Sequence, residues 1–148
     1  MDDPATDTPL DTGIDTGLDT AFDTPVSVET TGGEVVLTGP WRSPAQMLAD
    51  QVVDGHASVH DDSEAAALGL TGAPIEGPTH FSQFDPLAAH RWGRAWFERG
   101  CISSHFRTMV VEGERVRATL RLDEAAATFG RIDATKEDGS PVLTGTAS

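Results

Sequence analysis

Residues 60–77 read HDDSEAAALGLTGAPIEG, and this stretch decides which fold the rest of the chain can adopt. Its acidic start precedes a short alanine-rich piece, and aspartate is favoured at helix N-caps because its carboxylate accepts hydrogen bonds from the first backbone amides. We therefore predict a short helix over residues 63–68, capped by Asp61 or Asp62 and closed by Gly69. The Gly/Pro-rich turn that follows leads into the most aromatic part of the chain.

The chain from about Pro78 to Arg99 is predicted to form one long helix. Apolar residues recur there at spacings of three and four, which place them on one helix face. This stripe consists of Phe81, Phe84, Ala88, Trp92 and Ala95, and Trp96 widens it. Gly100 is expected to end the helix. A helix with so many aromatic residues needs a large apolar surface to cover it.

The cover is predicted to be a β-sheet. Residues 115–122 alternate polar and apolar side chains, as a strand with one buried face does. Further strands are expected at residues 102–111, 128–135 and 142–147. These elements predict an α+β fold in which one antiparallel sheet wraps around one long central helix, with short helices before it.

Two more elements are expected before the long helix. Residues 26–29 and 34–37 flank Thr-Thr-Gly-Gly, which indicates a hairpin. Ser43-Pro44 favours the start of a short helix over residues 44–52, because serine is a good N-cap and proline fits the first helical turn.

The first 25 residues differ in composition from the rest. Residues 7–26 consist of five copies of Asp-Thr-x-apolar, and a period of four fits neither an alternating strand nor a helix stripe. Residues 1–25 contain seven aspartates and no Lys or Arg. We predict that they form a disordered acidic tail and that residues 26–148 form one folded domain.

The overall charge and the cysteine count exclude several classes of partner. The chain has 148 residues and a formal net charge of -14, so nucleic acid or an anionic membrane surface would repel it. No apolar run approaches the ~18 residues that a membrane-spanning helix requires. A single cysteine, Cys101, cannot form an internal disulfide, which favours a reducing, cytoplasmic setting.

The stretch 60–77 and the helix after it resemble the MaoC-like hydratase/dehydratase group of the hot-dog fold superfamily. Its members carry a catalytic loop Asp-x-Asn-Pro-x-His-x-Asp, then a short alanine-rich helix, then a turn such as Pro-Ile-x-His-Gly that begins the central helix. The matching positions are His60, Asp62, Ala66, Gly69-Leu70, Pro74-Ile75 and Gly77. The resemblance extends over about residues 26–148, and some twenty residues carry it.

This chain departs from the family pattern at four places. The family's catalytic aspartate lies five residues before the histidine, where Gly55 stands here, and Asp54 lies one residue earlier. Ala57-Ser58 replace the Asn-Pro pair. Glu76 stands in place of the turn histidine, and His80 appears three residues after the turn glycine.

The resemblance implies a hydro-lyase acting on an enoyl or 3-hydroxyacyl thioester of CoA or a carrier protein, with no further cofactor. It implies an Asp/His pair, Asp54 and His60, for the proton transfers, and the backbone N–H of Gly77 as a donor to the thioester oxygen. His80 or Glu76 could have taken over acid/base work.

The same residues also fit purely structural roles, and these alternatives stay open. Asp61 and Asp62 serve equally as helix caps, His60 as a hydrogen-bonded loop residue, and Gly77 as a turn glycine. His56 and His60 are spaced as zinc ligands on a helix would be, but the residues between them are poor helix formers and include no Glu, so no metal site is expected.

Two other functions compete with hydration. The missing family Asp and Asn suggest a non-catalytic hot-dog subunit that binds acyl thioesters or pairs with an active chain. A hot-dog acyl-CoA thioesterase would use a carboxylate near the central helix, for which Glu76 or Asp85 is available.

Charge and edge arguments bear on partners. Nine of the ten Lys and Arg residues lie between Arg91 and Lys136. Arg115, Arg117 and Arg121 share one strand face, which is either a solvated face or a landing site for CoA phosphates. A lone sheet leaves exposed edges, so we expect a homodimer, or a heterodimer with another hot-dog chain.

Overall fold

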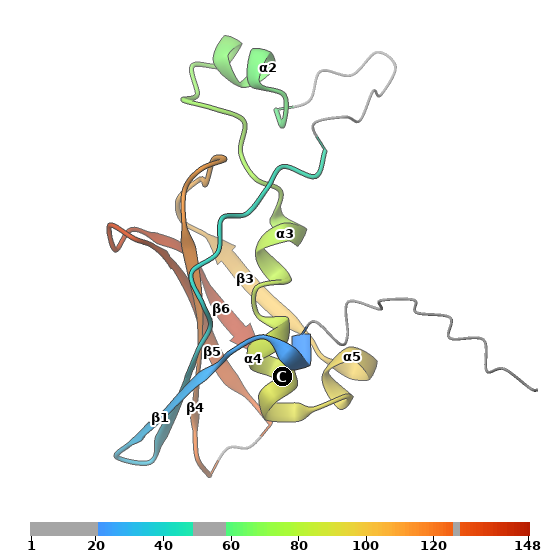
Figure 1. The fold of residues 1–148 in the computed structure, drawn as a ribbon, viewed down its shortest axis with the longest axis vertical. Helices are drawn as coiled ribbons and strands as arrows, with labels where there is room; N and C mark the ends of the chain where they lie inside the picture. The colour runs from blue at the N-terminus through green and yellow to red at the C-terminus, as the bar shows by residue number, and fades with distance from the viewer. Residues whose placement is uncertain (1–20, 49–58, 126–127) are drawn as a thin grey trace, which may run out of the picture.

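The computed structural model describes residues 21–48, 59–125 and 128–148. Its centre is a six-stranded sheet with the order β1-β2-β4-β5-β6-β3, in which every neighbouring pair is antiparallel (Figure 1). The strands are β1 (Ser27–Thr31), β2 (Glu34–Thr38), β3 (Ile102–Phe106), β4 (Val116–Asp123), β5 (Gly130–Lys136) and β6 (Pro141–Ala147). The edges of this sheet are β1 and β3.

The predicted hairpin is confirmed, because β1 and β2 pair across Gly32 and Gly33, which have φ angles of 62° and 84°. The predicted alternation in the strand after residue 115 is also confirmed: the apolar members of β4 are buried. These members are Val116, Ala118, Leu120 and Leu122. The predicted strand 102–111 is shorter than expected, since β3 ends at Phe106.

The short helix α2 (Asp62–Ala67) is confirmed, and Asp61 is its N-cap. The Asp61 carboxylate accepts hydrogen bonds from the amides of Ser63 and Glu64, at 2.9 and 3.2 Å. Gly69 follows the helix with a φ of 77°, a left-handed conformation that favours glycine.

The single long helix predicted over residues 78–99 is wrong. Three short helices stand in its place: α3 (Gly77–Phe81), α4 (Asp85–Trp92) and α5 (Ala95–Arg99). Pro86 has no amide proton to donate to the Ser82 carbonyl and its ring crowds that carbonyl, so the regular helix is interrupted at residues 82–84 and α4 begins with Pro86 in its first turn. Gly93, with a φ of 60°, ends α4.

The core nevertheless forms where a central helix was expected. The α3 and α4 helices follow one another along one face of the sheet (Figure 1). Phe84 and Leu87 are fully buried in one cluster with Leu37 of β2 and Leu120 of β4. Burial of such side chains stabilises the fold by about 1.5–3 kcal/mol each.

The helix predicted over residues 44–52 is also wrong for residues 44–48, which are not helical; residues 49–52 lie outside the described part. Side chains from distant segments accept from the amides of residues 46–48, of which Met47 and Leu48 would pair within a helix that began at residue 44. The Gln46 amide donates to Glu112 at 2.9 Å, and the amides of Met47 and Leu48 donate to Glu76.

Most of the predicted acidic tail, residues 1–20, lies outside the described residues. Residues 21–24 contact the rest of the fold. Ala21 is buried, the ring of Phe22 lies 6.1 Å from that of Phe97, and Thr24 accepts a hydrogen bond from Arg42 at 3.0 Å.

Candidate active site

A cavity of about 340 Å³ opens at the start of α3. One wall consists of Pro74, Ile75, Gly77 and His80, and the other of residues 106–110, which begin at the last residue of the edge strand β3. The Ile75 amide donates to the Val110 carbonyl at 2.8 Å, and this bond holds the two walls together. The cavity therefore joins the turn glycine of the sequence motif to a segment about thirty residues later.

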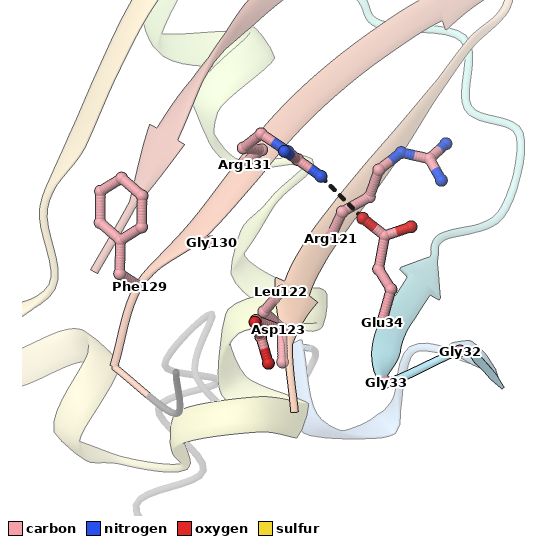
Figure 2. Close-up of a pocket in the computed structure, with 9 residues that line it drawn as sticks. All are labelled: Gly32, Gly33, Glu34, Arg121, Leu122, Asp123, Phe129, Gly130 and Arg131. Atoms are coloured by element: carbon pink, nitrogen blue, oxygen red, sulfur yellow. Dashed lines mark hydrogen bonds and ion pairs between the residues drawn. The ribbon is translucent and has the colours of Figure 1, made fainter. Parts of the chain in front are cut away.

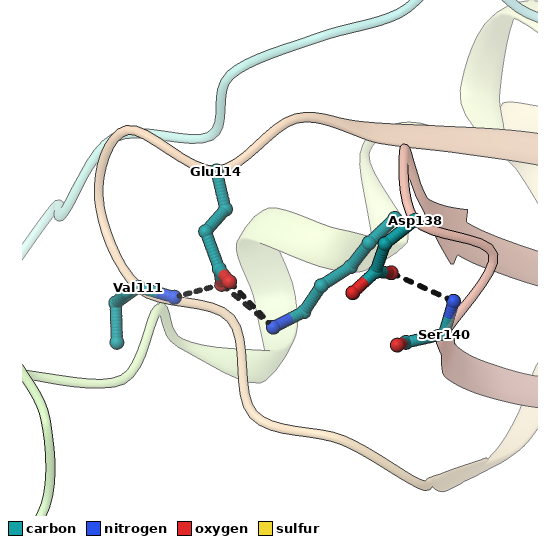
Figure 3. A network of polar contacts seen from close by, with 5 residues as sticks. Val111, Glu114, Asp138 and Ser140 are labelled. Atoms are coloured by element: carbon teal, nitrogen blue, oxygen red, sulfur yellow. Dashed lines mark hydrogen bonds and ion pairs between the residues drawn. The ribbon is translucent and has the colours of Figure 1, made fainter.

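A charged network fixes the second wall (Figure 3). Glu114 accepts from the Val111 amide at 2.9 Å and from the ammonium of Lys136 on β5 at 2.7 Å. Burial alone would raise the pKa of Glu114, but the bonds from Lys136 and Val111 outweigh it, so the pKa lies below its usual value. The ion pair between Glu114 and Lys136 thereby ties the loop that follows this wall to strand β5 of the sheet.

Gly77 is the first residue of α3, so its amide has no acceptor within the helix. The ring of Phe106 lies directly over it: a Cβ built on Gly77 would come 3.3 Å from Phe106 Cζ. Phe106 is 51% exposed, and its ring lies 5.9 Å from that of Phe81 and 6.0 Å from the imidazole of His80. Glycine thus brings the backbone close to an aromatic ring at the rim of the cavity.

His80 is the buried titratable group of this cavity, with 2% of its surface exposed. Desolvation lowers its pKa from the usual value near 6.5, and the negative charge of Glu76 opposes this without reversing it. His80 is therefore uncharged at neutral pH. Its Nδ1 lies 3.3 Å from the side-chain amide nitrogen of Gln83.

Glu76, at 5% exposure, is also buried, but it does not line the cavity. Its carboxylate accepts from the amides of Met47 and Leu48, at 2.9 and 2.7 Å, and from the Thr79 hydroxyl at 3.1 Å. Burial would raise the pKa of Glu76; backbone and hydroxyl donors together outweigh it and lower the pKa. Glu76 is an ionised clamp on residues 47–48, and both of its oxygens are engaged.

The motif histidine, His60, lines a neighbouring cavity of about 340 Å³ together with Asp61, Asp62 and Gln46. Its Nδ1 lies 2.7 Å from the Pro74 carbonyl, which can only accept. In the uncharged ring the proton therefore sits on Nδ1, and Nε2 is the acceptor nitrogen.

The two histidine cavities lie on either side of the β-bridge between Pro74 and Val111. The His60 cavity is lined by Ala73 and Val111, and the His80 cavity by Pro74 and Val110. The expected partner of His60, Asp54, and also His56, lie outside the described residues. Asp62 accepts from the Ala73 amide at 2.9 Å and so closes the α2 turn.

The three arginines predicted for CoA phosphates lie away from the Gly77–His80 cavity. Arg115 and Arg117 pack over the ring of Trp41, at 5.9 and 4.4 Å from its centre. Arg121 lines a separate cavity at the β1–β2 turn (Figure 2). Its Nε donates to the Asp133 carboxylate at 3.3 Å. In that cavity the guanidinium of Arg131 points to Glu34, at 2.7 Å.

Comparison with known proteins bears on the fold. No protein-family model and no curated protein matches the sequence. Among solved structures, an uncharacterised protein from Erwinia carotovora subsp. atroseptica has a TM-score of 0.50 at 9% identity, over 82% of this chain and 90% of its own. This likeness agrees with the single antiparallel sheet packed on α3 and α4. The chain has a hot-dog-like α+β fold.

Two further structures are more distant. The (R)-hydratase from A. caviae involved in PHA biosynthesis has a TM-score of 0.48 at 18% identity, over 80% of this chain and 94% of its own. A hypothetical thioesterase from Streptococcus pneumoniae TIGR4, solved with coenzyme A, has a TM-score of 0.44 at 13% identity, over 87% and 86%. Likenesses this remote do not extend to activity, because one fold hosts many chemistries.

Three residues in or beside the cavity of this hot-dog-like fold were not predicted from the sequence. Gln83 could have been found, because it lies three residues after His80 and that spacing makes side chains neighbours on a helix. Phe106 and Arg107 come from the end of β3 and give no local signal. Arg107 is the arginine that lines this cavity, with its Nε 3.3 Å from the Thr144 hydroxyl.

Neither a metal centre nor a membrane helix emerges from the described ranges. Within residues 21–48, 59–125 and 128–148, no three His, Cys, Asp or Glu side chains gather as metal ligands would. Over the same residues, no helix has the length and apolar character needed to cross a membrane. Cys101 is exposed and unpaired with another cysteine.

Proposed function

We propose that the chain is a MaoC-like hydro-lyase that adds water to, or removes it from, an enoyl or 3-hydroxyacyl thioester of CoA or a carrier protein. One observation carries the proposal: Gly77 and the buried His80 line the same cavity. The sequence resemblance supplies the reaction class.

Hydration of an enoyl thioester places hydroxide on the β-carbon and a proton on the α-carbon, and negative charge develops on the thioester oxygen in between. Hydrogen-bond donors aimed at that oxygen lower the barrier, and removal of one such donor costs roughly 10²–10³ in rate. The amide of Gly77 and the ring of His80 are available for this task in one cavity.

Hydration requires one proton to be taken from the attacking water and one to be delivered to the α-carbon, and we assign both transfers to His60 and its partner Asp54, with His60 as the base that activates the water. The support is the hydrogen bond from Nδ1 of His60 to Pro74, which leaves the lone pair on Nε2. His60 and His80 would then divide the work, one as the base and one beside the carbonyl oxygen. The segment from Ala73 to Gly77 connects their cavities.

The test is a substrate series. Crotonyl-CoA and longer enoyl-CoAs are incubated with the protein, and loss of the conjugated thioester absorbance is followed while free thiol is trapped colorimetrically. Hydration without thiol release supports the proposal. A folded protein that turns over no chain length contradicts it.

Thiol release from saturated acyl-CoA would instead identify a thioesterase, because the same donors also suit the oxyanion of thioester hydrolysis. The geometry gives that alternative less support, since the oxygens of Glu76 are engaged and Asp85 accepts from the Trp96 indole at 2.9 Å. Co-purification with a second hot-dog chain that has an intact Asp/His loop would favour the non-catalytic subunit.

We also propose a dimer. The edge strand β3 pairs with β6 on one side only, and its exposed members include Ser103, His105 and Phe106. An unpaired edge invites a second copy. A sizing experiment at micromolar concentration is expected to show no monomer.

A further inference from the structure

The side chain of Gln83 is buried beside His80, with 6% of its surface exposed. Its amide nitrogen lies 3.3 Å from His80 Nδ1, and its Oε1 is buried without a hydrogen bond to any described residue. The turn between α3 and α4 creates this contact: the Gln83 backbone amide donates to the His80 carbonyl at 3.3 Å. The break at residue 82 therefore sets the two side chains together.

The orientation of the Gln83 amide decides which nitrogen of His80 carries the proton. With the NH₂ toward Nδ1, the ring must accept there, so its proton sits on Nε2. The reverse orientation would place Oε1 at Nδ1 and would leave both NH₂ protons, instead of one, without an acceptor among the described residues. An unpaired carbonyl oxygen is tolerated more readily in protein interiors than unpaired N–H donors are.

We propose that Gln83 is a positioning residue that holds the proton of His80 on Nε2, so that His80 presents a hydrogen-bond donor, not a base, to a carbonyl oxygen in the Gly77 cavity. Nδ1 is occupied by Gln83, so Nε2 is the ring nitrogen available to a molecule there. The lowered pKa of His80 agrees, because an uncharged ring has only one proton to place.

This assignment separates the two histidines chemically. His60 carries its proton on Nδ1, bonded to Pro74, and is set up as a base at Nε2. His80 has the opposite tautomer and is set up as a donor. The role at the carbonyl rests on the proposed function, whereas the tautomer is a property of the free protein.

The test is a long-range ¹H–¹⁵N correlation spectrum of the full chain labelled at histidine nitrogens, without substrate. The His80 signals are identified by their loss in His80→Gln. The expected result is a protonated Nε2 and a bare Nδ1. The exposed His90 and His105 provide internal references for rings in water. A protonated Nδ1 on His80 in the wild type would overturn the proposal, whatever the activity.

Two variants test whether Gln83 is the cause. Gln83→Met keeps the volume and removes the amide, and is expected to give a mixture of tautomers. Gln83→Glu supplies an acceptor and is expected to move the proton to Nδ1, with kcat about tenfold lower, as for loss of other orienting partners. If Gln83→Glu does not fold, the Met variant still decides. An unchanged His80 spectrum in Gln83→Met refutes a positioning role. A wild type with the expected tautomer but no turnover refutes the proposed function alone.

Discussion

Phe106 covers Gly77 so closely that a methyl group on Gly77 would lie 3.3 Å from Phe106 Cζ. The contact joins the first residue of α3 to the last residue of β3, and it forms the rim of the cavity that also holds His80. Because Phe106 is half exposed, the ring can move if it is pushed. The contact therefore bears on the shape of the cavity more than on the stability of the fold.

Gly77→Ala is expected to displace Phe106 into the cavity mouth and to lower kcat/KM for an enoyl-CoA about tenfold or more, with a stability change within about 1 kcal/mol. Steady-state kinetics and urea unfolding measure the two effects. Gly39→Ala is the matched control, since its added methyl would meet only ordinary contacts at 3.7 Å. Adding Phe106→Leu to Gly77→Ala is expected to restore part of the rate. No loss of rate in Gly77→Ala would contradict this account of the rim.

Glu76→Gln removes the ionised acceptor of the Met47 and Leu48 amides and is expected to destabilise the fold by about 1–3 kcal/mol at pH 7. The pKa of Glu76 is lowered in the folded protein, so its contribution is present above the unfolded pKa near 4.3 and is lost as the pH falls through the folded value. Urea unfolding at pH 7 and below pH 4 should show a difference in the free energy of unfolding between wild type and variant, and this gap should be smaller in acid. The exposed Glu98→Gln serves as control, and a gap that does not depend on pH would speak against the ionised clamp.

Asp85→Asn is expected to stabilise the protein at neutral pH, with a melting temperature roughly 2–4 °C higher. Burial raises the pKa of Asp85, and the bond from the Trp96 indole opposes this only in part. A raised acid pKa means that protonation favours the folded state, so stability is lost as the pH rises through the folded pKa. Asparagine keeps the acceptor for Trp96 and removes the charge.

The same variant separates two activities. A hydro-lyase that works at Gly77 and His80 should retain its rate in Asp85→Asn. Loss of thiol release in this variant, with hydration absent from the wild type, would instead favour a thioesterase that uses Asp85.

Three local signals in the sequence predict the structure correctly. The cap at Asp61, the Gly32-Gly33 hairpin and the alternation of β4 depend on neighbours within a few residues, and all three are confirmed. The prediction of one long helix is wrong because it follows the apolar stripe alone, whereas Pro86 and Gly93, each a local helix-breaking signal, divide the segment.

The features that could not be predicted from the sequence depend on contacts between segments far apart in the chain. Residues 46–48 are not helical, and their amides donate to Glu112 and Glu76, segments that no spacing rule connects to them. Gly77 and His80 line one cavity, whereas His60 lines the neighbouring one. The opposite wall of the first cavity contains Phe106, which belongs to the edge strand β3. A site that joins two walls distant in sequence is visible only after folding.

The rate of crotonyl-CoA hydration by wild type, His80→Gln and His90→Gln tests the central claim most directly. If the Gly77–His80 cavity is the reactive site, the wild type hydrates the substrate, His80→Gln loses about 10²-fold in kcat/KM, and the exposed His90→Gln stays close to wild type. Hydration that persists undiminished in a folded His80→Gln would contradict the account.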